Sequence, residues 1–315
     1  MRADARRSAA LCLGLCLLAT ACEEGLPVGE GGGSRTVPAV LAPLPEWPAE
    51  ATRLRLGLIP VLGPDETART YQPLIEYLGT RLGVPAELVV AGDYGALTAL
   101  LARGEVDAAL FTALSYVEAK ERLPDLRLLL KQVVAGAETY VGYVYTTQEH
   151  PARTVEGLAG GVMCWVDPQS TSGYLFPRAL LRQRGHDPDR FFGRTEQGGN
   201  HLECLERVLS GRADASATYA GAFATGRSHG LPVDRIKIVG KTRRIPYNAL
   251  VARPGLPAPA AARLTGELLR LSTLSEEGQR SLSADMRLNA WAEAEDADYD
   301  DVRRVLAAER ATGRP

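Results

Sequence analysis

The chain has 315 residues, of which 45% are hydrophobic and 23% charged, and its formal net charge is −2. A chain of this length and composition can bury one or two sizeable cores, which excludes a mostly disordered protein. The slightly acidic balance lacks the basic excess of a nucleic-acid-binding protein, so we expect no nucleic acid among the partners.

Residues 1–21 have the pattern of a secretory signal. Arg2, Arg6 and Arg7 precede an uncharged run rich in Leu, Ala and Cys, which is too short to span a bilayer as a helix. The run ends in Leu-Ala-Thr-Ala before Cys22, which resembles a bacterial lipobox. We therefore expect a lipid anchor on Cys22 and a periplasmic protein held at a membrane face, with a plain cleaved signal as the alternative.

Residues 22–52 are rich in Gly and Pro and predict a flexible tether. Beyond them, strands are expected at 54–59, 87–90, 106–111, 126–133 and 140–146, with helices at 71–82 and 94–102. A second set has strands at 161–166, 213–219 and 236–240 and helices at 172–184 and 202–210, and two final helices are expected at 259–271 and 299–309.

This alternation of strands and helices predicts an α/β protein with largely parallel sheets. We divide it into lobe 1, residues 53–143 and 246–315, and lobe 2, residues 144–245. Cys164 and Cys204 both fall in lobe 2. A disulfide between them and a pair of buried thiols both remain open at this point.

Three consecutive hydroxyls, Ser170, Thr171 and Ser172, stand with Gly173 between a predicted strand and a predicted helix. Loops at the carboxyl ends of strands line the ligand crevice of an α/β sheet. The first turn of a helix has unpaired N–H groups and a positive partial charge, so hydroxyls there make a neutral socket for a tetrahedral anion. An ordinary helix cap is the alternative, because Ser and Thr are common N-caps.

The segment from Gly157 to Phe192, "GLAGGVMCWVDPQSTSGYLFPRALLRQRGHDPDRFF", resembles the centre of the phosphonate/phosphite/phosphate-type substrate-binding proteins of ABC transporters. Further matches are "YQPLIEYLGTRLGV", "GDYGAL", "GEVDAALFTALSYVEA" and a histidine ahead of "DASATY". The resemblance implies a bilobed type II periplasmic-binding-protein fold, in which two α/β lobes close on a hinge around the ligand.

The resemblance also implies a set of ligand-binding residues. Ser170, Thr171 and Ser172 would hold the oxygens of the anion, and Tyr94 would donate a hydrogen bond to the same group. Where many relatives have a second phenol this chain has Phe111, so we expect the neighbouring Thr112, also a candidate helix cap, to supply that donor.

His201 matches a histidine that reaches toward the ligand in the family. Relatives that take an aminoalkylphosphonate place carboxylates where this chain has Gly221 and Asn248. A buried ammonium group without a carboxylate partner is costly, so the ligand is expected to have no cationic tail.

The function implied is capture of a small phosphorus oxyanion, namely phosphite, phosphate or an alkylphosphonate, for import through ABC permease subunits of the inner membrane. The alternative is a ligand sensor that reports to a membrane kinase or receptor. We expect a monomer with no cofactor. The sequence has no G-x-S-x-G, P-loop or H-E-x-x-H motif and no metal-ligand spacing, which disfavours an enzyme and a metal site.

Overall fold

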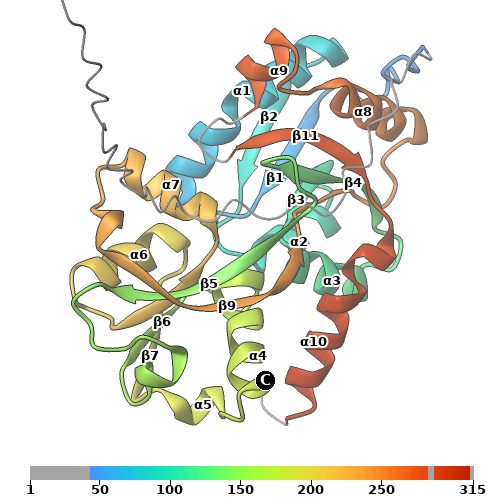
Figure 1. Cartoon of the computed structure of the whole chain (residues 1–315). Coiled ribbons are helices and arrows are strands. Elements are labelled where there is room, and N and C mark those ends of the chain that lie inside the picture. The colour runs from blue at the N-terminus through green and yellow to red at the C-terminus, as the bar shows by residue number, and fades with distance from the viewer. Residues whose placement is uncertain (1–42, 283–286, 313–315) are drawn as a thin grey trace, which may run out of the picture. The chain divides into compact units, whose positions relative to one another are not determined.

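The computed structural model describes residues 43–282 and 287–312. The predicted signal and the lipidation at Cys22 lie outside the described residues. Within them, the chain forms two sheets covered by helices (Figure 1). Among the described residues, no helix combines the length and the apolar composition needed to cross a bilayer.

The first sheet has six strands in the order β11-β4-β10-β3-β1-β2. These strands are β1 (Leu54–Leu58), β2 (Ala86–Val90), β3 (Ala108–Phe111), β4 (Arg127–Val134), β10 (Ala249–Ala252) and β11 (Leu288–Glu293). The helices that go with it are α1 (Pro64–Leu82), α2 (Ala96–Ala102), α3 (Ala113–Arg122), α8 (Ala258–Arg270) and α9 (Glu276–Ser281).

The second sheet has five strands in the order β7-β6-β8-β5-β9. They are β5 (Thr139–Thr147), β6 (Val162–Trp165), β7 (Arg194–Gln197), β8 (Ala215–Thr218) and β9 (Ile236–Pro246). Its helices are α4 (Phe176–Gln183), α5 (Pro188–Phe191), α6 (His201–Leu209) and α7 (Ala220–Ser228). The two long strands β5 and β9 pair antiparallel from Thr139 opposite Pro246 to Thr147 opposite Ile236, and they carry the chain between the two halves.

The prediction of largely parallel sheets is wrong. In the described residues, β1 is parallel to β2 and β3, and β6 is parallel to β7 and β8, but β10, β11, β5 and β9 all pair antiparallel. In the first sheet the reason is that β10, which belongs to the returning C-terminal part of the chain, lies between β3 and β4 and runs antiparallel to both. Strands β10, β11 and β7 and helices α5, α7 and α9 were absent from the predicted elements, whereas α3 was indicated only through its candidate cap Thr112.

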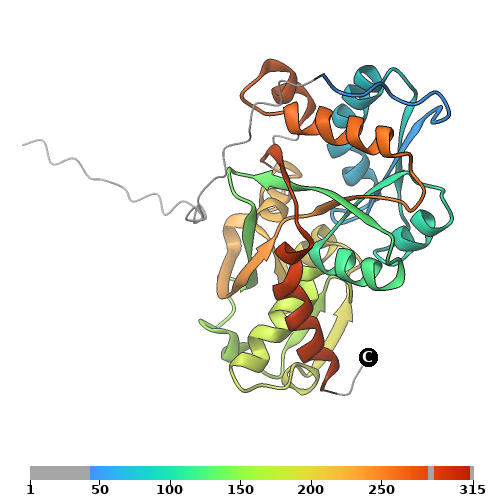
Figure 2. The ribbon, with the colours of Figure 1, turned by 90° about the vertical axis from the view of Figure 1, so that its right-hand side faces the viewer.

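The last helix, α10 (Asp300–Arg310), lies along both halves of the molecule, and Figures 1 and 2 show it beside α4. Glu309 pairs with Arg178 at 2.6 Å and Arg182 at 2.7 Å, both on α4. At the same end of the helix, Arg310 pairs with Glu121 on α3 at 3.0 Å. The α10 helix therefore contacts a helix of the first sheet, α3, and a helix of the second sheet, α4. The lobe boundaries at 143/144 and 245/246 stay a prediction.

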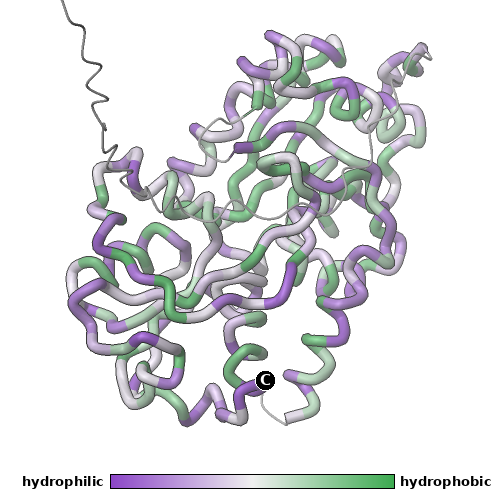
Figure 3. Tube along the Cα trace, viewed as in Figure 1, coloured by the Kyte–Doolittle hydropathy of each residue, from purple (hydrophilic) through white to green (hydrophobic). Residues whose placement is uncertain are grey.

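Apolar side chains from the strands and from the inner faces of the helices fill the core, and Figure 3 shows the hydrophobic stretches along the strands of the first sheet. In α1, Leu74, Ile75 and Leu78 are buried at helical spacing. Because one core cluster includes residues of both halves, for example Tyr94 and Phe223, the two lobes are in close contact in this structure.

Candidate ligand-binding site

The three consecutive hydroxyls follow strand β6 and open a helical turn, η2 (Thr171–Leu175), that continues into α4. Ser170 is the N-cap, and its hydroxyl accepts a hydrogen bond from the backbone N–H of Gly173 at 3.0 Å. Packing requires a glycine at position 173, because a Cβ there would lie 2.4 Å from the Val166 side chain and 2.8 Å from Ser170 Oγ.

The hydroxyls of Ser170, Thr171 and Ser172 are all buried. Thr171 Oγ1 accepts a hydrogen bond from the backbone N–H of Leu114, 2.8 Å away at the start of α3. A hydroxyl that accepts in this way still has its own proton to donate. In the described residues, backbone N–H groups donate to the hydroxyl oxygens of Ser170 and Thr171. The protons of these two uncharged hydroxyls can therefore be donated to another group.

The preceding loop docks on the N-terminus of α3. Thr112 caps that helix by accepting from the Ser115 N–H at 3.2 Å, which confirms the predicted cap. The hydroxyls of Thr112 and Ser115 also donate to the carbonyl of Gln169, at 3.3 and 3.2 Å. The Thr112 hydroxyl therefore joins the two halves of the protein here, and its contact with a ligand stays a prediction.

Tyr94 stands just before α2 and is fully buried. Among the described residues its hydroxyl has no hydrogen-bond partner. Burial raises the pKa of the Tyr94 phenol well above its usual range, although the nearby Ser170 hydroxyl lowers it. Ser170 is thus close to this phenol without meeting hydrogen-bond geometry, and Tyr94 remains a neutral donor. Phe111, at the end of β3, is buried in the apolar core.

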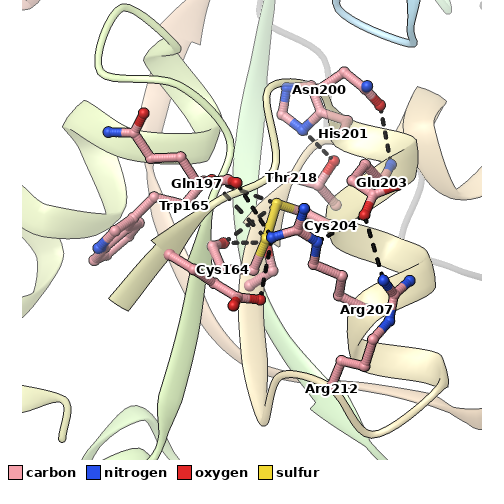
Figure 4. Close-up of a disulfide and its surroundings, with 12 residues drawn as sticks. Cys164, Trp165, Gln197, Asn200, His201, Glu203, Cys204, Arg207, Arg212 and Thr218 are labelled. Atoms are coloured by element: carbon pink, nitrogen blue, oxygen red, sulfur yellow. Dashed lines mark hydrogen bonds and ion pairs between the residues drawn. A yellow bond between two sulfur atoms is a disulfide. The ribbon is translucent and has the colours of Figure 1, made fainter. Parts of the chain in front are cut away.

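His201 is the first residue of α6, and its backbone N–H donates to the carbonyl of Val61 at 2.9 Å. Its ring Nδ1 lies 2.8 Å from the hydroxyl of Thr218, as Figure 4 shows. Burial lowers the pKa of His201 to about 3. The imidazole is therefore neutral near pH 7, and it can meet a ligand only as a neutral hydrogen-bonding group.

Asn248 lies between β9 and β10, where its carbonyl accepts from the Gln132 N–H at 3.1 Å. The Gln132 side chain in turn donates to the Tyr71 hydroxyl at 3.0 Å. Both Gln132 and Tyr71 are buried. Asn248 is thus near a buried polar pair that no sequence motif indicated.

Several tyrosines also converge near the hydroxyl turn, and sequence motifs did not reveal them as a group. The Tyr140 ring lies 4.8 Å from the Tyr247 ring and 6.1 Å from the Tyr219 ring, measured between centroids. Burial raises the pKa of Tyr140 well above its usual range, and the Ser172 hydroxyl beside it lowers it. In the sequence, Tyr219 and Tyr247 end or flank predicted strands, and these positions favoured packing over contact with a ligand.

Cys164 in β6 and Cys204 in α6 form a disulfide (Figure 4). The structure therefore decides between the two alternatives left open by the sequence. The bond ties the strand that leads to Ser170 to the helix that begins with His201. It fixes the two predicted ligand-binding segments of lobe 2 to each other.

A cavity of about 330 Å³ lies elsewhere, lined by residues that include Trp165, Tyr174, Arg178 and Gln197. It contains none of the predicted ligand-binding residues. The Ser170, Thr171 and Ser172 residues are themselves buried in this structure. Within residues 43–282 and 287–312, no group of three or more His, Cys, Asp or Glu side chains is placed to hold a metal ion.

The chain folds into two halves, each built on one sheet, and the long paired strands β5 and β9 join the halves. This is the architecture of a type II periplasmic-binding protein, so the predicted fold class is confirmed. A family model described as "ABC transporter, phosphonate, periplasmic substrate-binding protein" matches residues 56–299. The chain belongs to this family. It is therefore a periplasmic component of an ABC importer that delivers a small molecule to permease subunits.

Relatives agree with this assignment. The chain is 26% identical over 280 residues to the phosphate-import protein PhnD of Mycolicibacterium smegmatis, covering 80% of this chain and 84% of that protein. A binding protein component of an ABC phosphonate transporter from Pseudomonas aeruginosa is similar in structure, with a TM-score of 0.75, 19% identity, and coverage of 82% and 86%. PhnD1 of Prochlorococcus marinus, in complex with methylphosphonate, has a TM-score of 0.75 at 18% identity, with coverage of 82% and 98%.

Proposed function

We propose that this protein captures a small phosphorus oxyanion without a cationic tail, and that Ser170, Thr171 and Ser172 seat its oxygens. The observation that carries the proposal is the row of buried hydroxyls at the contact between the two halves. Backbone N–H groups hold the oxygens of Ser170 and Thr171, whose protons can be donated to an anion. Such preset neutral dipoles can bind an anion without a counter-charge.

The relatives support the ligand class, since one is named for phosphate import and another is a complex with methylphosphonate. Around the hydroxyl turn, Tyr94 and His201 add neutral polar groups. By the resemblance to the family, Gly221 and Asn248 occupy the positions at which relatives place carboxylates for an ammonium group. The proposed ligands are therefore phosphite, phosphate and short alkylphosphonates.

Binding would close the two halves on the ligand. Contacts that join them in this structure include Leu114 N–H to Thr171 at 2.8 Å, His201 N–H to the Val61 carbonyl at 2.9 Å, and His229 to Glu66 at 2.8 Å. An open form would lack these contacts and expose the hydroxyls. A ligand touching both halves would favour the closed form.

Calorimetric titration with phosphate, phosphite, methylphosphonate, aminoethylphosphonate, sulfate and taurine tests the ligand class. We expect binding of one or more of the first three and much weaker binding of aminoethylphosphonate, because its ammonium group would be buried unpaired. Recovery of the ligand unchanged after incubation is expected, since we propose no catalysis. The absence of measurable binding to any of the phosphorus compounds would refute the proposal.

Replacing Ser170 with alanine, or Thr171 with valine, should weaken binding of the preferred anion by about 1–3 kcal/mol, the cost of one lost donor to a buried anion. Valine keeps the shape of threonine while removing its hydroxyl. Isothermal titration of each variant gives the comparison, with Thr146→Val as the control, because the Thr146 hydroxyl donates to the carbonyl of Asp214 inside lobe 2. Unchanged affinity in both Ser170→Ala and Thr171→Val would count against the socket.

We further propose that Cys22 carries a lipid and that the mature protein is a monomer at the membrane face. A lipobox-like run before Cys22 supports the anchor. Fractionation of cells expressing the wild type and Cys22→Ala should find the first with the membranes and the second in the soluble periplasm. Equal distribution of the two would show that Cys22 is not the anchor.

A further inference from the structure

Tyr219 lies among the proposed ligand-binding residues. It follows strand β8 and is the N-cap residue of α7. Its ring stands edge-on to the His201 imidazole, with centroids 5.0 Å apart, and the Tyr140 ring is 6.1 Å away. Tyr140 in turn adjoins Ser172. Tyr219 is therefore linked to the hydroxyl turn through Tyr140 and to the α6 N-terminus through His201.

The hydroxyl of Tyr219 is buried and has no hydrogen-bond partner among the described residues. Tyr94 is one of the tyrosines near Tyr219, and its hydroxyl is also buried without a hydrogen-bond partner among the described residues. Buried polar atoms in folded proteins are nearly always paired, because an unpaired one is costly. The Tyr94 and Tyr219 hydroxyls lie beside the proposed anion site. Their lack of a protein partner indicates that polar atoms of the ligand form hydrogen bonds with them.

The residue two positions later explains how the Tyr219 ring is held. A Cβ on Gly221 would lie 2.6 Å from Tyr219 Cε2 and 3.1 Å from Cδ2. Real Cβ atoms do not approach a ring carbon so closely, so no side chain fits at position 221 while the ring keeps this place. The absence of a side chain at Gly221 therefore leaves the space that the Tyr219 ring occupies.

We propose that Tyr219 is a specificity-determining residue, whose hydroxyl pairs with a ligand oxygen that the Ser170, Thr171 and Ser172 hydroxyls do not take. This inference rests on the proposed function. A phenol both donates and accepts, so it can pair with P–O⁻ or with P–OH. A P–H or P–CH₃ group cannot pair with it. The preferred ligand is then an oxyanion with four oxygens around phosphorus, inorganic phosphate, ahead of phosphite and methylphosphonate.

The test compares Tyr219→Phe with the wild-type protein by titration with phosphate and with methylphosphonate. Phenylalanine keeps the ring and removes only the hydroxyl. We expect the Kd for phosphate to rise about 10-fold or more, with the Kd for methylphosphonate changing less than about twofold. Tyr145→Phe is the matched control, because Tyr145 is also fully buried but its phenol lies beside Ser216 and its ring packs against Phe223, within lobe 2.

Gly221→Ala provides a second variant should Tyr219→Phe fold poorly. The added Cβ must displace the Tyr219 ring, so the preference for phosphate over methylphosphonate should fall in this variant as well. The inference is overturned if Tyr219→Phe weakens both ligands equally or neither, or if the wild type prefers methylphosphonate. A wild type that binds no phosphorus oxyanion instead refutes the proposed function, and this inference with it.

Discussion

Breaking the Cys164–Cys204 disulfide is expected to lower the free energy of unfolding by about 2–4 kcal/mol. The two cysteines are 40 residues apart in sequence, so the cross-link restricts a long loop in the unfolded chain. The bond also joins β6 to α6, which carry the hydroxyl turn and His201. We therefore expect ligand affinity to fall together with stability.

Urea unfolding with and without reductant measures the change, and Cys164→Ala/Cys204→Ala gives the same comparison without reductant. Peptide mapping of protein isolated from an oxidising compartment provides the control, since it should recover the two cysteines in one linked peptide. Recovery of both as free thiols, or identical urea midpoints for the oxidised and reduced protein, would contradict the prediction.

Stability is also expected to fall as the pH is lowered, because His201 is buried as a neutral ring. Its folded-state pKa of about 3 lies below the ordinary value of 6.5. Between these values the unfolded chain binds a proton that the folded protein does not, so protonation favours unfolding. The stabilisation is complete above the ordinary pKa, and it is lost by about 1.4 kcal/mol per pH unit as the pH falls toward the folded value.

Urea titrations at pH 7, 6 and 5 measure this slope, and His201→Gln is the matched variant because glutamine keeps a polar group near Thr218 without titrating. The difference between the two profiles isolates His201 from the other histidines. Parallel profiles would show that His201 is not held neutral. Over the same range, any change in ligand affinity should follow the protonation of the ligand, because the His201 charge does not change.

The sequence by itself determined the family, and it supplied the residues on which the proposed ligand chemistry rests. Local patterns are sufficient for this: the run around Ser170 is contiguous, and hydrophobic periodicity predicted most of the helices and strands. The N-cap at Thr112 was also predictable, because capping depends on neighbouring residues. Residues such as Tyr94 and His201 came from the family resemblance, and their contact with a ligand stays a prediction.

Only the tertiary structure decided how distant segments meet. Strands β10 and β11 pair with residues far away in sequence, so no local pattern could give their antiparallel direction. The Cys164–Cys204 bond, the docking of Thr171 on the N–H of Leu114, and the fit of the Tyr219 ring over Gly221 all depend on three-dimensional packing. The hydrophobic pattern and hydrogen bonds between neighbouring residues specify the individual helices, strands and caps. Steric fit and the pairing of buried polar groups specify how these elements come together as a site.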